Sequence, residues 1–170
     1  MIEILILYQL NKKILTMYGI SKGIRTEFSV LTSPSFGTIK PALMRLEKKG
    51  LIKSQKTLSE GGRPSVYYSI TKEGEKAFEE EILAPVQDNP IQFLTTARVR
   101  LICSQILDFE IQRALINILK TRTKSLIAET NNIIVSEKLD FNYRMVLDNL
   151  ICEFKNFENL LEGFERAGNN

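Results

Sequence analysis

Residues 33–74 restrict the possible folds of this chain more than any other stretch. They begin with Ser33-Pro34, a capping residue followed by a proline, which is a common start for a helix. A lysine-rich amphipathic segment then runs to Gly50, and a glycine-tipped extended segment follows it. The stretch ends in Thr71-Lys-Glu-Gly74, where the threonine suits the cap of a further helix. This order predicts a helix, a β-hairpin and another helix in one small domain.

The first helix of this stretch is expected to end at Lys49, because the glycine after it is a typical C-terminal stop. Its apolar residues recur at the spacing of one buried helical face. Pro41 would remove a backbone hydrogen bond from the interior of a helix that started at Ser33. We therefore expect the regular helix to begin near Thr38, after an irregular lead-in.

The predicted fold class is mainly α with a small β-hairpin. The hairpin turn contains Gly61 and Gly62, which tolerate positive φ, and Pro64, which limits strand pairing at that end. Helical periodicity accounts for most of the remaining chain. The predicted strands cover residues 51–58 and 65–70, and the predicted helices cover about 2–10, 18–28, 38–49, 71–83, 91–105, 108–135 and 141–166.

The prolines of residues 84–90 mark the segment that most resembles a linker, and we place a domain boundary there. Residues 1–83 have the order of a winged helix-turn-helix domain, and residues 91–170 are expected to form a helical domain. The two longest helices of the second domain should pair as an antiparallel hairpin, which leaves apolar surface uncovered in a single chain. We therefore expect residues 91–170 to form a homodimer.

Positive charge is concentrated in the N-terminal half. Residues 1–76 carry 13 Lys+Arg and 6 Asp+Glu, a local charge of +7, whereas residues 77–170 carry 10 and 14, a local charge of −4. A basic helix beside a basic β-ribbon suits double-stranded DNA, because the helix can enter the major groove while the ribbon rests on phosphate. The charge therefore indicates a polyanionic partner. A winged-helix module that binds an acidic protein is the alternative left open.

Composition also disfavours several functional classes. The chain has no histidine, which rules out a Ser-His-Asp triad and any His-based zinc site. Cys103 and Cys152 lie in apolar helical patterns without a Cys-x-x-Cys spacing, and both are expected to be buried free thiols, with a disulfide between them as the alternative left open. Phosphate-cradling glycine loops and paired-carboxylate motifs are absent, so we expect no enzyme activity, metal or cofactor. No apolar run reaches about eighteen residues, so we expect a soluble, cytoplasmic protein without a membrane partner.

Four motifs in the N-terminal half match a known pattern. They are Tyr18-Gly19-Ile20, Ser35-Phe-Gly-Thr-Ile-Lys-Pro-Ala-Leu-Met-Arg-Leu-Glu-Lys-Lys-Gly-Leu-Ile52, Gly61-Gly62-Arg63-Pro64 and Tyr67-Tyr68-Ser-Ile-Thr-Lys-Glu-Gly74. With them the chain resembles the PadR-like family of transcriptional regulators. The resemblance is specific across residues 35–74 and extends in order over about 1–83. The C-terminal half resembles, in layout, the longer subgroup whose C-terminal helices form the dimer.

The resemblance implies a homodimeric repressor that binds a pseudo-palindromic operator and loses affinity for it when a small-molecule effector binds. Two positions depart from the family pattern. The family usually shows His-Gly-Tyr where this chain has Tyr18-Gly19-Ile20, and a tyrosine where this chain has Lys40. The family tyrosines are associated with DNA contact. Lys40 can still donate to a phosphate or to guanine.

Six residues are candidate DNA contacts. Lys40 is the best placed to reach a base edge, and Arg63 at the wing tip suits the minor groove. A solubilising loop arginine is the alternative for Arg63. Lys48 and Lys49 are more simply explained as a solvated last turn that complements the helix dipole. The full candidate set is Tyr18, Ser35, Thr38, Lys40, Arg45 and Arg63.

Overall fold

The computed structural model describes residues 1–58, 64–86, 89–136 and 138–168. The chain divides into two compact units. The first comprises Met1–Ala84 and Arg98–Cys103, and the second comprises the described residues of Pro85–Ala97 and Ser104–Asn170. Within the described ranges, no helix is long and apolar enough to cross a membrane.

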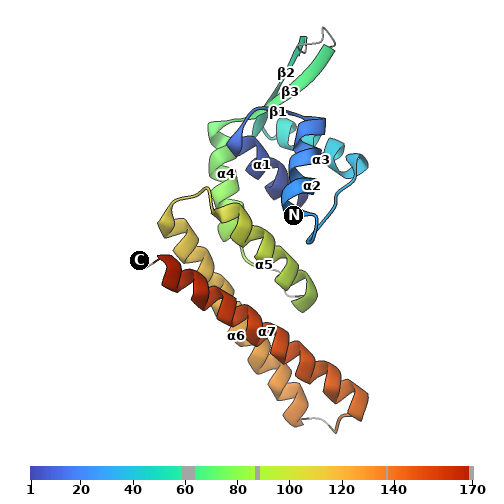
Figure 1. The fold of residues 1–170 in the computed structure, drawn as a ribbon, viewed down its shortest axis with the longest axis vertical. Helices are drawn as coiled ribbons and strands as arrows, with labels where there is room; N and C mark the ends of the chain where they lie inside the picture. Colours follow the sequence, from blue (N-terminus) through green and yellow to red (C-terminus); the bar gives the residue numbers. More distant parts are fainter. Residues whose placement is uncertain (59–63, 87–88, 137, 169–170) are drawn as a thin grey trace. The chain divides into compact units, whose positions relative to one another are not determined.

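The first unit has the predicted order of a helix, a hairpin and a further helix, preceded by two more helices (Figure 1). Its elements are α1 Ile2–Lys12, β1 Leu15–Thr16, α2 Met17–Phe28, α3 Phe36–Lys48, β2 Ile52–Leu58, β3 Pro64–Ile70 and α4 Lys72–Leu83. The β2–β3 hairpin, here called the wing, projects beyond the helices of this unit (Figure 1). The predicted class, mainly α with a small amount of β structure, is confirmed.

The sheet has one strand more than the predicted hairpin, and its order is β1-β3-β2. β1 pairs with β3, with Leu15 opposite Tyr68 and Thr16 opposite Tyr67. A strand of two residues leaves no alternation in the sequence, so periodicity could not predict it. This strand ties the wing to α2, because Thr16 is also the N-cap of α2 and accepts a hydrogen bond from Gly19 N at 3.1 Å.

The start of α3 differs from the prediction. Ser35 is the N-cap instead of Ser33, and the helix begins at Phe36 instead of near Thr38. Pro41 therefore lies inside the helix. The proline removes one backbone hydrogen bond, but it lies on the exposed side of α3, where water can reach the carbonyl left unpaired. This limited cost explains why the helix does not have to begin later.

Two glycines fix the junction of α3, β2 and α4. Gly50 ends α3 with φ +72°, the left-handed conformation of a glycine stop, as predicted. Gly74 lies in the first turn of α4, and a Cβ there would collide with the backbone carbonyl of Leu51. Thr71 is the predicted cap of α4. Its hydroxyl accepts from Gly74 N at 3.0 Å and donates to Gly50 O at 2.8 Å.

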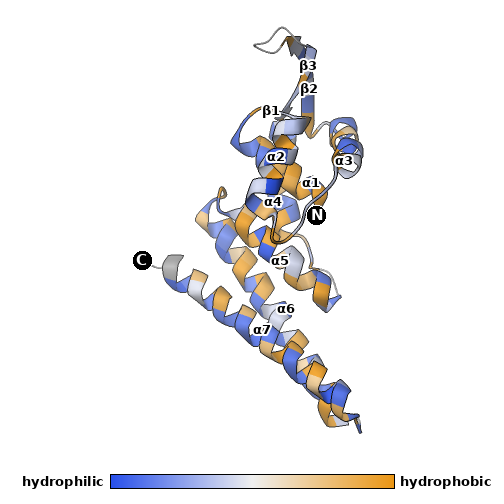
Figure 2. Cartoon of the chain, turned by 45° about the vertical axis from the view of Figure 1, so that its right-hand side comes forward, coloured by the Kyte–Doolittle hydropathy of each residue, from blue (hydrophilic) through white to orange (hydrophobic). Residues whose placement is uncertain are grey.

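α1 is the central helix of the first unit. It contacts α2, α3, α4 and β3, and its residues from Ile4 to Leu10 are all buried. Figure 2 shows this helix as largely hydrophobic. Its polar groups are satisfied by Glu27 of α2, which accepts hydrogen bonds from three α1 side chains: Tyr8 Oη at 2.9 Å, Gln9 Nε2 at 3.0 Å and Lys12 Nζ at 2.7 Å.

Glu27 should make the stability of the first unit depend on pH. Burial favours its neutral form, but the hydrogen bonds from α1 outweigh burial and hold the pKa of Glu27 below its ordinary value of 4.5. Because the folded-state pKa is lowered, the stabilisation is present above about pH 4.5 and is lost as the pH falls through that pKa. Glu27→Gln should lower the free energy of unfolding at pH 7 by about 1–2 kcal/mol. Urea titrations followed by circular dichroism would measure it.

The control for this variant is Glu80→Gln. Glu80 is exposed and forms a single ion pair at 3.8 Å within α4, which contributes little to stability. On acidification, Glu27→Gln should lose less stability than the wild type, whereas Glu80→Gln should follow the wild type. An unchanged acid dependence in Glu27→Gln would contradict the role of this carboxylate.

The second unit is a helical hairpin together with part of one further helix. Its elements are α5 Pro90–Ser104, which contributes residues to both units, α6 Phe109–Ser136 and α7 Phe141–Gly168. α6 and α7 run antiparallel, side by side (Figures 1 and 2). Lys120 of α6 pairs with Glu165 of α7 at 2.7 Å, and the rings of Phe93 and Phe157 meet edge to face at 5.9 Å. The three predicted C-terminal helices are confirmed.

Candidate nucleic-acid interface

Two of the predicted contacts, Tyr18 and Lys40, lie at one shallow groove of the first unit. This hollow of about 380 Å³ lies between the start of α2, α3 and the wing. Tyr18 is 68% exposed, and the Lys40 side chain is exposed as well. Tyr68 of β3 forms part of the lining, and burial and the nearby Glu47 raise its pKa. The groove is lined by Thr16, Met17, Tyr18, Lys40, Ser65, Val66 and Tyr68.

The outer face of α2 carries two cations that the sequence prediction missed. Lys22 and Arg25 are exposed and line a second hollow, which also includes Tyr18 and Phe36. Tyr18, Lys22 and Arg25 follow the i, i+4, i+7 spacing, opposite the buried residues of α2. That spacing is visible in the sequence and could have identified both residues.

The start of α3 presents hydroxyl and amide groups to solvent. Ser35, Phe36, Gly37 and Thr38 are all exposed. Ser35 makes no side-chain capping bond, and its hydroxyl instead lies 3.2 Å from that of Thr38. The first amides of α3 therefore lack a side-chain partner within the described part of the chain. Such amides, at the positive end of the helix dipole, suit a phosphate.

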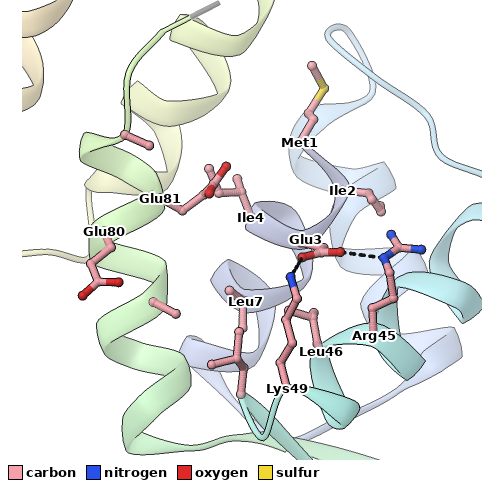
Figure 3. Close-up of a pocket in the computed structure, with 13 residues that line it drawn as sticks. Met1, Ile2, Glu3, Ile4, Leu7, Arg45, Leu46, Lys49, Glu80 and Glu81 are labelled. Atoms are coloured by element: carbon pink, nitrogen blue, oxygen red, sulfur yellow. Dashed lines mark hydrogen bonds and ion pairs between the residues drawn. The ribbon is translucent and has the colours of Figure 1, made fainter.

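Arg45 lies beside α1 (Figure 3). Its Nε donates to Glu3 Oε1 at 2.8 Å, and Lys49 Nζ donates to Glu3 Oε2 at 3.2 Å. Burial favours the neutral acid, but the bonds from Arg45 and Lys49 hold the pKa of Glu3 below 4.5. The three side chains border an open hollow of about 520 Å³ between α1, α3 and α4. Arg45 thus has an intramolecular partner, although its side chain is 53% exposed.

Cations continue from α3 onto the wing. Lys48 of α3 and Lys53 and Lys56 of β2 are exposed, and none of the three has an ion-pair partner among the residues that the structure describes. Arg63, the predicted wing-tip contact, lies outside the described residues. The roles proposed for all six candidate residues remain predictions.

The described residues contain neither a candidate metal site nor a reactive buried thiol. No group of three His, Cys, Asp or Glu side chains there could hold a metal ion. Both cysteines are free thiols, but the expected burial is correct only for Cys103, because Cys152 lies on an exposed side of α7. Burial raises the pKa of the Cys103 thiol well above its ordinary value, so it stays protonated and unreactive.

The motifs of the N-terminal half agree with comparisons to known proteins. The family model described as "Transcriptional regulator PadR-like family" matches residues 6–80. A PadR family transcription regulator from Clostridium difficile is 39% identical, over 47% of this chain and 81% of that chain, with a TM-score of 0.41. No match was found among curated proteins.

Two longer matches cover nearly the whole chain. PadR of Bacillus subtilis, in complex with operator DNA, is 18% identical over 95% of this chain and 94% of that chain, with a TM-score of 0.47. A PadR-like transcriptional regulator from Bacillus cereus is 22% identical over 99% and 98%, with a TM-score of 0.44. All three TM-scores lie below 0.5, so the assignment rests on the family model and the 39% identity. The chain belongs to the PadR-like family of transcriptional regulators.

Proposed function

We propose that this chain is a homodimeric, sequence-specific DNA-binding repressor that acts in the cytoplasm and loses operator affinity when a small-molecule effector binds. The observation that carries the DNA-binding part is a set of exposed cations on α2, α3 and the wing. Lys22, Arg25, Lys40 and Lys48 have no ion-pair partner within the described residues. Exposed cations without an ion-pair partner can replace the counterions that surround the phosphates of a duplex. The sign of regulation and the effector rest on the family resemblance.

Recovery of bound fragments from genomic DNA by the full-length chain tests this function. We expect a small set of fragments that share a pseudo-palindromic sequence, because a two-fold symmetric dimer reads two half-sites. Deletion of the gene should raise transcription next to those fragments. Fragments without a shared sequence, together with no shift in an electrophoretic mobility assay, would favour the alternative of an acidic protein partner.

The homodimer is expected to form through the second unit. Large apolar side chains of this unit remain exposed in the single chain, and Figure 2 shows hydrophobic segments along the α6–α7 hairpin. Val146, Leu160 and Phe164 share one side of α7, next to its buried face. Monomeric proteins rarely expose large contiguous apolar surfaces. The exposed residues are Ile91, Ile106, Phe109, Val135, Phe141, Tyr143, Met145, Val146, Leu160 and Phe164.

Sedimentation should therefore show a dimer at micromolar concentration. The double variant Val146→Glu/Phe164→Glu should raise the dimer dissociation constant by at least about 100-fold, because two charges per chain would be buried without partners. Lys155→Glu is the control, since Lys155 is exposed on the opposite side of α7. A full-length protein that stays monomeric would contradict this architecture.

Glu3 should weaken DNA binding by holding two cations of α3. Glu3→Gln should raise the affinity for operator and scrambled duplexes alike, by about two- to tenfold, because Arg45 and Lys49 become available for phosphate. Glu80→Gln removes the same charge from the same hollow without touching either cation. Fluorescence anisotropy would compare the two variants. Equal gains would mean that net charge, and not the Glu3 contacts, sets the effect.

A further inference from the structure

The exposed face of α3 carries a large apolar side chain between two lysines. Met44 is 63% exposed, and Lys40 and Lys48 lie one helical turn before and after it. The buried stripe of α3 faces away from it and consists of Ile39, Ala42, Leu43 and Leu46. Met44 is therefore not part of the core of the first unit.

A single exposed apolar side chain needs no explanation by itself. Met44 differs because it belongs to an exposed strip of α3 formed by Lys40, Pro41, Met44 and Lys48. In this strip Pro41 lies beside Met44, and a lysine lies at each end. The natural partner of such a strip is strongly anionic but offers an apolar group to the helix. Duplex DNA fits this description, because the C5-methyl group of thymine is the apolar feature of the major groove. Methionine is flexible enough to follow a methyl group at that depth.

We propose that Met44 selects thymine in each operator half-site by packing against the C5-methyl group, while Lys40 and Lys48 position the helix by contacting phosphates and base edges. This specificity role rests on the DNA-binding function proposed above. It places an apolar contact at the centre of α3, whereas the candidates identified from the sequence on this helix are all polar. Phe36 is 42% exposed but lies at the helix start beside α2, so it is not assigned this role.

The test begins with a duplex selected from a random-sequence pool by the full-length chain. Each thymine of that duplex is then replaced by uracil, which removes only the methyl group. For the wild type, at least one replacement per half-site should weaken binding by about fourfold, the value of one buried methyl-sized group. Met44→Ala should weaken binding to the thymine duplex by at least as much, and it should no longer distinguish thymine from uracil.

The wild type and Met44→Ala on the thymine and uracil duplexes form a double-mutant cycle, and two further variants serve as controls. Met44→Leu keeps an apolar contact and should retain the thymine preference. Val30→Ala changes a side chain that is 91% exposed in the turn between α2 and α3, and it should behave as the wild type. The proposal is overturned if no thymine is sensitive in the wild type, or if Met44→Ala keeps the same preference. Failure to enrich any sequence from the pool would instead overturn the proposed function itself.

Discussion

The affinity of the full-length chain for its operator should fall by about 10³–10⁵-fold between about 50 and 200 mM salt. The reason is the local charge of +7 in residues 1–76, much of it on exposed side chains of α2, α3 and the wing. If each subunit engages about three to five phosphates, a plot of log affinity against log salt should have a slope of roughly −5 to −9. Anisotropy titrations at four salt concentrations would give this slope directly.

Single substitutions should change the slope in a way that identifies the phosphate contacts. Lys22→Ala and Arg25→Ala should each make it shallower by about one unit per subunit, since each removes one released counterion. Lys76→Ala is the control, because Lys76 lies on α4 and pairs with Glu80. A slope near zero for the wild type would point to a protein partner and away from DNA.

Most of the first unit could be predicted because the residues that start and end its helices act locally. Glycine and threonine mark the end of α3 and the start of α4, and both signals act within one helical turn. The start of α3 could not be predicted in the same way. Pro41 favoured a later start, because a proline inside a helix removes a backbone hydrogen bond. Its exposed position in α3 reduces the cost of that lost bond. This exposure depends on packing that the sequence does not show directly.

The candidate interface was predicted in part, for a similar reason. Tyr18 and Lys40 do lie at one groove, because α2 and α3 contact each other and both contact the wing. Arg45 carries the same charge and lies on the same helix, yet it points to α1 and binds Glu3 (Figure 3). That contact spans 42 residues of sequence, and no local pattern signals it. Lys22 and Arg25 were missed although their helical spacing was readable.

The pairing of Arg45 divides the cations of α3 into two groups. Lys40 and Lys48 have no ion-pair partner in the described ranges and are ready to replace counterions, whereas Arg45 and Lys49 must first leave Glu3. Exposed ion pairs are weak, about 0–1 kcal/mol, so this difference tunes affinity without preventing contact. Contact of α3 with DNA should accordingly depend more on Lys40 and Lys48 than on Arg45 and Lys49.

Lys40→Ala should lower the affinity for the operator by about 1–3 kcal/mol, roughly 5- to 150-fold, and should lower the affinity for scrambled DNA far less. Lys40 is exposed in the first half of α3 and borders the groove shared with Tyr18, where a helix entering the major groove would present it to base edges. Contacts to base edges carry discrimination, whereas contacts to phosphate weaken all sequences alike. Anisotropy on operator and scrambled duplexes at three salt concentrations would separate the two.

Arg63→Ala is the informative comparison for Lys40→Ala. Arg63 belongs to the tip of the wing in the sequence, so its loss should weaken both duplexes more evenly and make the salt slope shallower by about one unit per subunit. Arg45→Ala should lower the affinity for the operator less than Lys40→Ala does, because the Arg45 guanidinium is already paired with Glu3. If Lys40→Ala weakened both duplexes equally, Lys40 would be a phosphate contact, and base selection by α3 would have to come from other exposed residues such as Met44.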